Sequence, residues 1–401
     1  MSPVTKSTPS RPQLVLAPGK ERFLDRHHPW IFSGAIARTM GHAEEGDIVD
    51  VVAPDGRWLC TGHFQKESIR VKVLSYDTPI IDTAFWRDRL KKAIDYRRRL
   101  GFLGTGATTN VFRLIHAEGD WLPGLVADYY NGAVVLQAHS EGMHRQFDLF
   151  VQLLRELLGE DLKAVFDKSS ATLPSGNAVD QYLFGPTPEE WEICENGCRM
   201  RINFFEGQKT GFFVDQRENR QLVGSLSHNC RVLNCFGYTG GFSLAALQGG
   251  ASYVETVDIS KKAIALCERN VALNFGESAP HQGVVADVLD YMDKVGNDFD
   301  LIILDPPAFA KNHYVLQQGL KGYRTINQKA IEKIRPGGLL FTFSCSQAVS
   351  LEDFQTMVFS SANLAGRKVR IVKRLPHAVD HPVSVYHPEG EYLKGLLLYV
   401  E

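Results

Sequence analysis

Three aspartates and one cysteine in the second half of the chain are the residues best suited to chemistry. Each lies at or just after the end of a short apolar run, and they are Asp258, Asp287, Asp305 and Cys345. Carboxylates accept hydrogen bonds from sugar hydroxyls and base amines, and a thiol can become a nucleophile. The pattern therefore predicts a site that holds a nucleoside and attacks an electrophilic carbon.

Residues 232–247, VLNCFGYTGGFSLAAL, predict a strand, a tight glycine turn and a helix that starts near Phe242. Glycines allow the backbone to bend sharply and to lie close to a ligand. Asp258 follows the turn by about twenty residues, the spacing at which a carboxylate binds a ribose diol. We expect a nucleoside-containing cofactor to contact Phe236, Gly237, Tyr238, Thr239, Gly240, Gly241, Asp258 and Ile259.

This loop favours S-adenosylmethionine over a dinucleotide. A pyrophosphate-binding turn needs the pattern G-x-G-x-x-G. The loop lacks that pattern, and the bulky Phe236 and Tyr238 stand where such a turn stays small. S-adenosylmethionine carries no phosphate and tolerates both side chains. Asn234 stands in place of the acid that often opens the methyltransferase form of this loop.

Residues 300–309, DLIILDPPAF, predict a buried strand that ends in a carboxylate and two prolines. Prolines restrict the backbone and would hold Asp305 where a reacting base lies. The motif indicates methyl transfer to a nucleic-acid base, although a plain strand-ending turn can share it. At the preceding strand end, we expect Asp287 and Val288 to contact the adenine of the cofactor.

Cys345 lies in the run FTFSCS at residues 341–346. A lone cysteine is commonly an inert buried side chain, but the end of a strand at the same sheet edge favours a nucleophile. The carbon C5 of cytosine reacts poorly with a sulfonium methyl group. Addition of a thiolate at C6 makes C5 enamine-like and divides one difficult step into easier ones.

Strand candidates alternate with helices in residues 191–401, which predicts an α/β, Rossmann-like, doubly wound sheet. The predicted strands cover residues 232–235, 253–257, 282–285, 299–304, 339–344 and 368–374. Short alternating strands and turn signals predict a small β-rich domain at residues 13–80. Residues 81–190 predict a central α+β domain with a helix around 143–158.

Residues 86–99 predict an amphipathic helix whose outer face is basic. Such runs are often solvated faces, but they also bind phosphates. The candidate RNA contacts on this helix are Arg87, Arg97, Arg98 and Arg99.

The bulk composition narrows the class of protein. The chain has 401 residues and a net charge of −2, so its whole surface is not polyanion-binding. Its seven cysteines do not have the spacing of a disulfide-bonded framework, which fits a reducing cytosol. No apolar run is long enough to cross a membrane. Residues 1–12 are polar and proline-rich and predict a disordered tail rather than a signal peptide, so we expect a cytoplasmic protein.

Motifs along nearly the whole chain resemble those of the bacterial 23S (large-subunit) ribosomal RNA cytosine-5 methyltransferases that carry a PUA domain. The motifs are HPWIFS at residues 28–33, GDWLPGLVAD at 119–128, GQKTGFFVDQRENR at 207–220, LDPPAF at 304–309, FSCS at 343–346 and PEGEYLKG at 388–395. The resemblance implies a PUA-like RNA-binding domain at residues 13–80 and a class I methyltransferase domain at residues 191–401.

The resemblance also implies roles for single residues. Cys345 is the implied nucleophile and Asp305 its catalytic partner, while Thr210, Asp215, Gln216 and Arg217 are expected to line the cofactor or target pocket. Many cytosine-5 RNA methyltransferases carry a second cysteine after the proline of the Asp305 motif, where this chain has Pro307 and Ala308. The group that removes the C5 proton is therefore open, with Asp305 and Lys311 as candidates. Lys311 is also a candidate RNA contact.

Large-subunit ribosomal RNA is the implied partner, no membrane contact is expected, and a homodimer is left open. Two rival functions stand beside cytosine-5 methylation. Methylation of a guanine or adenine nitrogen also uses an Asp-Pro-Pro motif but needs no nucleophilic cysteine, so Cys345 separates the two. A non-catalytic RNA-binding assembly factor would not need the aspartates or Cys345.

Overall fold

The structure is a computed structural model that describes residues 11–104, 108–173, 176, 178–310 and 313–401. Lys311 and most of the predicted N-terminal tail lie outside these residues. The chain forms two compact units. The first runs through Trp191 and takes in Ile202–Phe212 and Asp380–Gly390, and the second comprises Glu192–Arg201, Phe213–Val379 and Glu391–Glu401. The domain boundaries at residues 80 and 190 stay predictions.

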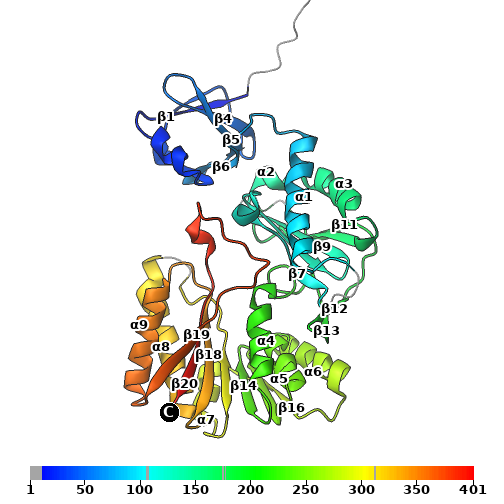
Figure 1. The fold of residues 1–401 in the computed structure, drawn as a ribbon, viewed down its shortest axis with the longest axis vertical. Helices are drawn as coiled ribbons and strands as arrows, with labels where there is room; N and C mark the ends of the chain where they lie inside the picture. The colour runs from blue at the N-terminus through cyan, green and yellow to red at the C-terminus, as the bar shows by residue number, and fades with distance from the viewer. Residues whose placement is uncertain (1–10, 105–107, 174–175, 177, 311–312) are drawn as a thin grey trace, which may run out of the picture. The chain divides into compact units, whose positions relative to one another are not determined.

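The first unit begins with a curved six-stranded sheet, drawn in blue in Figure 1. Its order is β2-β6-β5-β4-β1-β3. Side chains such as Leu14, Val49, Val51 and Val71 are fully buried between its strands. The strands are β1 (Gln13–Leu16), β2 (Trp30–Phe32), β3 (Ile36–Met40), β4 (Ile48–Val52), β5 (Trp58–Phe64) and β6 (Ile69–Ser75). The β-rich N-terminal fold predicted from the sequence is confirmed.

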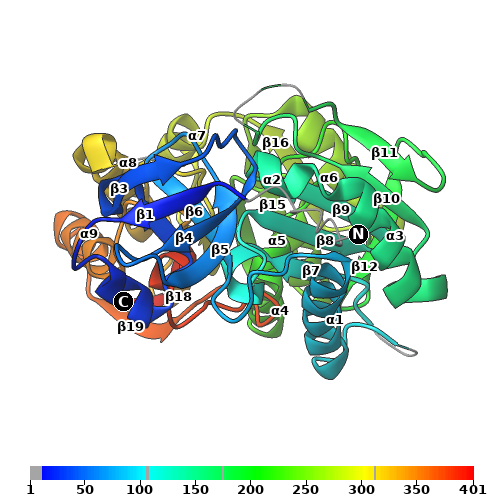
Figure 2. The same ribbon diagram turned by 90° about the horizontal axis from the view of Figure 1, so that it is seen from above.

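The first unit also contains a five-stranded sheet of order β11-β10-β9-β8-β7. It comprises β7 (Val111–His116), β8 (Leu125–Tyr130), β9 (Ala133–Ala138), β10 (Ala164–Asp167) and β11 (Gln181–Phe184). Helix α1 (Thr83–Arg99) lies beside α3 (Phe147–Leu158) and packs against this sheet (Figures 1 and 2). The structure has two helices where the sequence predicts one around residues 143–158. Two residues separate the first, α2 (Glu141–His144), from the start of α3 at Phe147.

The second unit opens with the hairpin of β12 (Trp191–Glu195) and β13 (Cys198–Ile202) and contains a seven-stranded sheet. The sheet order is β16-β15-β14-β17-β18-β20-β19. Its strands are β14 (Arg231–Cys235), β15 (Tyr253–Asp258), β16 (His281–Val285), β17 (Leu301–Leu304), β18 (Gly338–Ser344), β19 (Val369–Arg374) and β20 (Lys394–Val400). All six predicted strands are present, whereas β20 was not predicted.

Helices cover both faces of this sheet, as a doubly wound fold requires (Figure 1). One face carries α4 (Arg217–Ser225), α5 (Gly241–Gln248) and α6 (Lys261–Phe275). The other carries α7 (Val288–Lys294), α8 (Leu316–Lys333) and α9 (Leu351–Leu364). The strands from β16 to β18 are parallel, so their carboxyl ends share one edge. No helix in the described part of the chain is long and apolar enough to cross a membrane.

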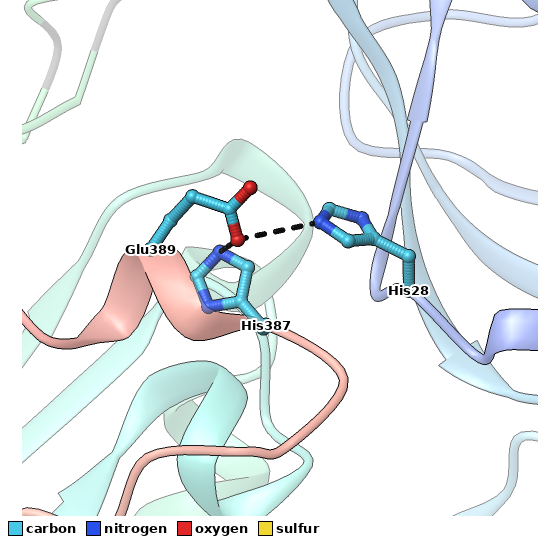
Figure 3. A group of neighbouring side chains, drawn as sticks. All are labelled: His28, His387 and Glu389. Carbon is cyan, nitrogen blue, oxygen red and sulfur yellow. Dashed lines mark ion pairs between the residues drawn. The ribbon is translucent and has the colours of Figure 1, made fainter.

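The segment Asp380–Gly390 returns to the first unit late in the chain. The Asp380 carboxylate accepts a hydrogen bond of 2.7 Å from the backbone N–H of Arg113. Further along, Oε2 of Glu389 lies 3.5 Å from Nε2 of His28 and 3.9 Å from Nε2 of His387, as Figure 3 shows. The His387 ring also packs edge-on against Trp30, with 4.4 Å between ring centroids. The segment is therefore an integral part of the first unit.

Candidate active site

The loop after β14 is held in a conformation that leaves little space around its backbone. Phe236 and Tyr238 have φ values of 59° and 47°, and Gly240 has 87°. A Cβ atom on Gly237 would lie 2.2 Å from Cγ2 of Thr256, and one on Gly240 would lie 2.4 Å from Sγ of Cys267. Only glycine fits these two positions, because the loop is pressed against β15 and α6. The packing of this loop against β15 and α6 therefore requires glycine at both positions.

Asp258 ends β15 beside this loop. Its Oδ2 accepts a 3.0 Å hydrogen bond from the backbone N–H of Tyr238, and its Oδ1 accepts one of 2.8 Å from Ser260. These bonds orient the half-buried carboxylate, and each oxygen keeps a second lone pair. Ile259 is 71% exposed, so an apolar face stands next to the acid. This pairing suits a ribose diol beside a flat base.

Asp287 follows β16 on the far side of Asp258. Its Oδ1 caps α7 by accepting hydrogen bonds from the backbone N–H groups of Leu289, at 2.8 Å, and Asp290, at 3.2 Å. Val288 is 3% exposed and packs in the core under α7. Only the backbone of Val288 is therefore placed to contact a cofactor, whereas the exposed Asp287 can offer its second oxygen.

Asp305 follows β17, on the other side of the glycine loop. Its Oδ1 accepts a 3.1 Å hydrogen bond from Nε2 of Gln216, and Oε1 of Gln216 accepts one of 2.7 Å from Nδ2 of Asn219. Gln216 and Asn219 are buried. This chain of bonds fixes the orientation of the Asp305 carboxylate.

Cys345 follows β18, the next strand along the edge, and its side chain is partly exposed. The Asp305 and Cys345 loops are tied together, because Oγ of Ser346 accepts a 3.2 Å hydrogen bond from the backbone N–H of Ala310. The Tyr323 hydroxyl also lies 2.8 Å from that oxygen. By contrast, burial raises the pKa of the Cys267 thiol to about 12, which keeps it protonated. Cys345 is thus the partly exposed thiol at this edge of the sheet, whereas Cys267 is buried.

The five parallel strands therefore bring Asp287, Asp258, the glycine loop, Asp305 and Cys345 to one edge, in that order across the sheet. Lys394, the first residue of β20, joins them, and the sequence predicted no role for it. Its ammonium group donates to the carbonyl oxygen of Ser346 at 2.6 Å. A single lysine at the start of an apolar strand carries no local signal of such a contact.

Thr210, Asp215 and Arg217 are also predicted to line the pocket, and each is bonded to other protein side chains. Thr210 belongs to the first unit, where its buried hydroxyl donates to Asp128 and lies 2.8 Å from the Tyr130 hydroxyl. This side chain is buried and hydrogen-bonded within the first unit, and its role in the cofactor or target pocket stays a prediction. Asp215 accepts a 2.6 Å hydrogen bond from the Tyr392 hydroxyl, and Arg217 pairs with Glu218 at 3.0 Å.

The basic helix α1 is less uniform than its sequence suggests. Arg97 is fully buried and forms a 2.6 Å ion pair with Asp120, so it does not lie on the outer face and its assignment to RNA is corrected. Arg87 and Arg98 lie on the surface in ion pairs with Glu156, at 3.0 Å, and Asp95, at 3.2 Å. Arg99 is exposed. The outer face therefore keeps cations, but acids neutralise part of its charge.

The residues of the second unit fit S-adenosylmethionine. The glycine loop is packed closely on β15 and α6 beside Asp258, whose carboxylate can accept hydrogen bonds from a diol. Oγ1 of Thr239 in the same loop is buried and has no hydrogen-bond partner among the described residues. Residues 113–386 match the family described as S-adenosylmethionine-dependent methyltransferase. The chain belongs to this family.

The cofactor of this methyltransferase is therefore S-adenosylmethionine. Residues 14–76 match the PUA-like domain family. The methyltransferase is 39% identical to ribosomal RNA large subunit methyltransferase I of Aeromonas salmonicida, over 96% of this chain and 98% of the relative. It is 38% identical to the protein of that name from Escherichia coli, with the same two coverages.

A solved methyltransferase from Streptococcus mutans has the same fold. The two structures superpose with a TM-score of 0.82 at 23% identity, covering 96% of this chain and 99% of the other. This likeness extends over both units and agrees with a PUA-like fold followed by a class I methyltransferase fold.

Proposed function

We propose that this methyltransferase forms 5-methylcytosine in large-subunit ribosomal RNA through a covalent bond between Cys345 and C6 of the base. The relatives from Aeromonas salmonicida and Escherichia coli are named for large-subunit ribosomal RNA and match nearly the whole chain. The observation that carries the cytosine assignment is the thiol of Cys345 at the same sheet edge as Asp258 and Asp305. A nitrogen methyltransferase has no need for that thiol.

The chemistry follows from the placement of these side chains. S-adenosylmethionine supplies an electrophilic methyl group. The Cys345 thiolate adds to C6, and the electrons of the C5–C6 double bond move into the ring and leave C5 nucleophilic. As the thiolate adds, N3 takes a proton from the carboxyl group of Asp305, which is oriented by Gln216, and the resulting carboxylate accepts a hydrogen bond from that N–H until the proton returns to it when the thiolate leaves. After methylation, loss of the C5 proton restores the double bond and expels the thiolate. We assign the proton acceptor to Asp305 or Lys311.

The first unit would grip the RNA. Besides the outer face of α1, it has a groove of about 800 Å³ beside β2. Its walls include the aromatic side chains of Trp30, Phe32 and Tyr386 and the cations Lys20 and Arg26. Phe32 and Tyr386 are 50% and 42% exposed. Aromatic rings with nearby cations bind single-stranded RNA by stacking and by neutralising phosphates. A cytosine must be in such a single-stranded or flipped-out state for C6 to be reached.

The experiment that tests the cytosine assignment is covalent trapping. Ribosomal RNA from a deletion strain is first mapped by mass spectrometry to find the unmethylated cytosine. An RNA fragment with 5-fluorocytosine at that position should then form a stable adduct with the protein, because fluorine cannot leave as a proton does. The Cys345→Ala variant should form no adduct and show no turnover while still binding cofactor and RNA. Cys194→Ala, which changes another partly exposed cysteine, serves as the control.

Each other outcome points to a named rival. Full activity of Cys345→Ala, or no adduct with the wild type, would favour methylation of a guanine or adenine nitrogen. RNA binding without any methyl transfer would favour a non-catalytic assembly factor. The homodimer stays a prediction, which the mass of the protein in solution tests.

A further inference from the structure

Lys394 is placed against the loop that carries Cys345. It is the first residue of β20, and its register partner on the antiparallel neighbour β18 is Ser344. Cys345 follows Ser344 directly. The lysine side chain runs past this strand end, because its Nζ donates to the carbonyl oxygen of Ser346 at 2.6 Å and to that of Tyr392 at 2.7 Å. Cys345 therefore lies between Ser344, which pairs with Lys394 across the two strands, and Ser346, whose carbonyl oxygen accepts a hydrogen bond from Lys394.

The ammonium group is buried and has no carboxylate partner in the part of the chain that the structure describes. Lys394 is 7% exposed. Among the described residues, no carboxylate lies within ion-pair distance of its Nζ, and its two bonds go to neutral carbonyl groups. Burial lowers the pKa of Lys394 to about 8, while the neighbouring charges of Cys345 and Glu391 raise it. A buried cation of this kind is most stable when an anion forms beside it.

We infer that the Lys394 ammonium group stabilises the thiolate of Cys345 and so prepares the nucleophile before RNA binds. Lys394 is a positioning residue in this role, because it acts through Cys345 and not on the base. The thiol proton passes to solvent, and the sulfur remains as an anion beside the ammonium. The sulfur then forms the bond to C6. The inference rests on the proposed function in one respect only, which is that the thiolate attacks C6 of a cytosine.

The other titratable groups around this pair support the assignment. Tyr323, on α8, bonds to Oγ of Ser346, and burial raises the pKa of its hydroxyl. It therefore stays neutral and does not compete with Cys345 for the cation. Glu391 lies before β20, and its charge favours the protonated form of Lys394. Among the described residues, Lys394 is thus a cation whose charge acts on Cys345, while the Tyr323 hydroxyl beside Ser346 stays neutral.

A lower thiol pKa raises the fraction of Cys345 that is thiolate and lowers the reactivity of each thiolate. The first effect is the larger one, so the reaction becomes faster. Nucleophilicity falls with thiol pKa with a Brønsted coefficient of about 0.4–0.5, so a tenfold gain in thiolate loses only about threefold in reactivity. The net gain at neutral pH is about threefold, and a lowered thiol pKa next to lysine is common in reactive cysteines.

The test measures the Cys345 thiol itself, in the full-length protein without RNA or cofactor. Alkylation by iodoacetamide is followed against pH, and the Cys345 peptide is quantified by mass spectrometry. In Lys394→Met we expect the midpoint of this profile to rise by about one pH unit and the rate near pH 7 to fall about threefold. Lys394→Arg keeps the charge and should restore most of the rate. Lys333→Met is the matched control, because Lys333 also donates to a carbonyl, that of Val295, at 2.9 Å.

Two results would overturn the inference. One is an unchanged Cys345 profile in a folded Lys394→Met protein. The other is a wild-type midpoint at or above about 8.5, the value of an ordinary thiol, and this measurement needs no variant. The methylation assay of Cys345→Ala is separate. If that variant stays active, the proposed function fails, whereas the role of Lys394 is still decided by the alkylation profile.

Discussion

We expect cofactor affinity to depend most directly on Asp258. Its two oxygens are already oriented by the backbone N–H groups of Tyr238 and Ser260. A diol that binds to an acceptor fixed in this way costs little rearrangement, since the carboxylate is held in place before the ligand arrives. The exposed Ile259 beside it offers apolar contact and adds no competing polar group.

We therefore expect Asp258→Ala to weaken S-adenosylmethionine binding about ten- to a hundredfold, or roughly 1.5–3 kcal/mol for a lost charged acceptor. Asp258→Asn, which keeps one acceptor oxygen, should fall between the alanine variant and the wild type. Calorimetry measures both, with the exposed Asp290→Asn on α7 as the control. Unchanged affinity in Asp258→Ala would remove this residue from the cofactor site.

Some site residues could be predicted from the sequence and others could not. Asp258, Asp305 and Cys345 each follow an apolar run, and parallel strands place such residues at one edge. The burial of Arg97 depends on Asp120 and on the carbonyl oxygen of Asp380, far along the chain. No local pattern contains those partners, so the alternation of charged and apolar residues in this helix predicts a basic outer face that wrongly includes Arg97.

At the scale of elements, α1 has two kinds of arginine. Arg97 contributes to the core, whereas Arg98 and Arg99 remain on the surface at the last turn of the helix. The surface ion pair of Arg98 with Asp95 contributes little to stability. A phosphate group can therefore replace Asp95 at small cost, while the Arg98 guanidinium also donates to the carbonyl oxygen of Leu157 at 2.9 Å.

Charge reversal of Arg98 and Arg99 to glutamate should weaken RNA binding and leave cofactor binding unchanged. The slope of log affinity against log salt should shrink by about 1–2, which is about one for each phosphate that the helix no longer binds. Lys163→Glu reverses one charge at an exposed site outside the helix, half the charge change of the double variant, and should alter the slope by less than half as much. Fluorescence anisotropy at several salt concentrations decides the matter, and equal slopes in all three proteins would make α1 a solvated face only.

The elements themselves were easier to predict than their order in space. Six strands of the large sheet were predicted because they alternate with helices and end in turn residues. β20 was missed, although Lys394–Val400 is apolar, because a long stretch with only one short 3-10 helix, and no α-helix, separates it from β19. Its antiparallel position between β18 and β19 depends on long-range pairing, which hydrophobic periodicity does not encode.

At the scale of the whole molecule, acid should destabilise the first unit. His63 is fully buried between Trp86 and Gly142, and neither ring nitrogen has a hydrogen-bond partner among the described residues. Burial, followed by the charges of Lys72 and Arg145, lowers the pKa of His63 to about 3. Unfolded histidine takes up a proton near pH 6.5. The stability that neutral His63 contributes is thus present above pH 6.5 and is lost as the pH falls towards 3.

Because His63 has a lower pKa in the folded than in the unfolded protein, the free energy of unfolding should be about 2 kcal/mol lower at pH 5 than well above pH 6.5. His63→Phe removes the titrating group and keeps a ring, so the free energy of unfolding of the first unit should fall about 2 kcal/mol less between pH 7.5 and pH 5 than in the wild type. Urea unfolding at the two pH values measures the difference, with the exposed His228→Phe as the control. Equal pH dependence in wild type and His63→Phe would show that other groups set the acid sensitivity.

The return of residues 380–401 to both units has a consequence for how the protein is made. Asp380–Gly390 completes the first unit, and β20 joins β19 to β18 in the second. Synthesis proceeds from the N-terminus, and domains generally fold as they emerge. Here a nascent chain that stops short of Asp380 has Arg113 without the Asp380 carboxylate and a gap between β18 and β19. A prematurely terminated chain should therefore leave neither half intact, so that cells accumulate no fragment that binds RNA without methylating it.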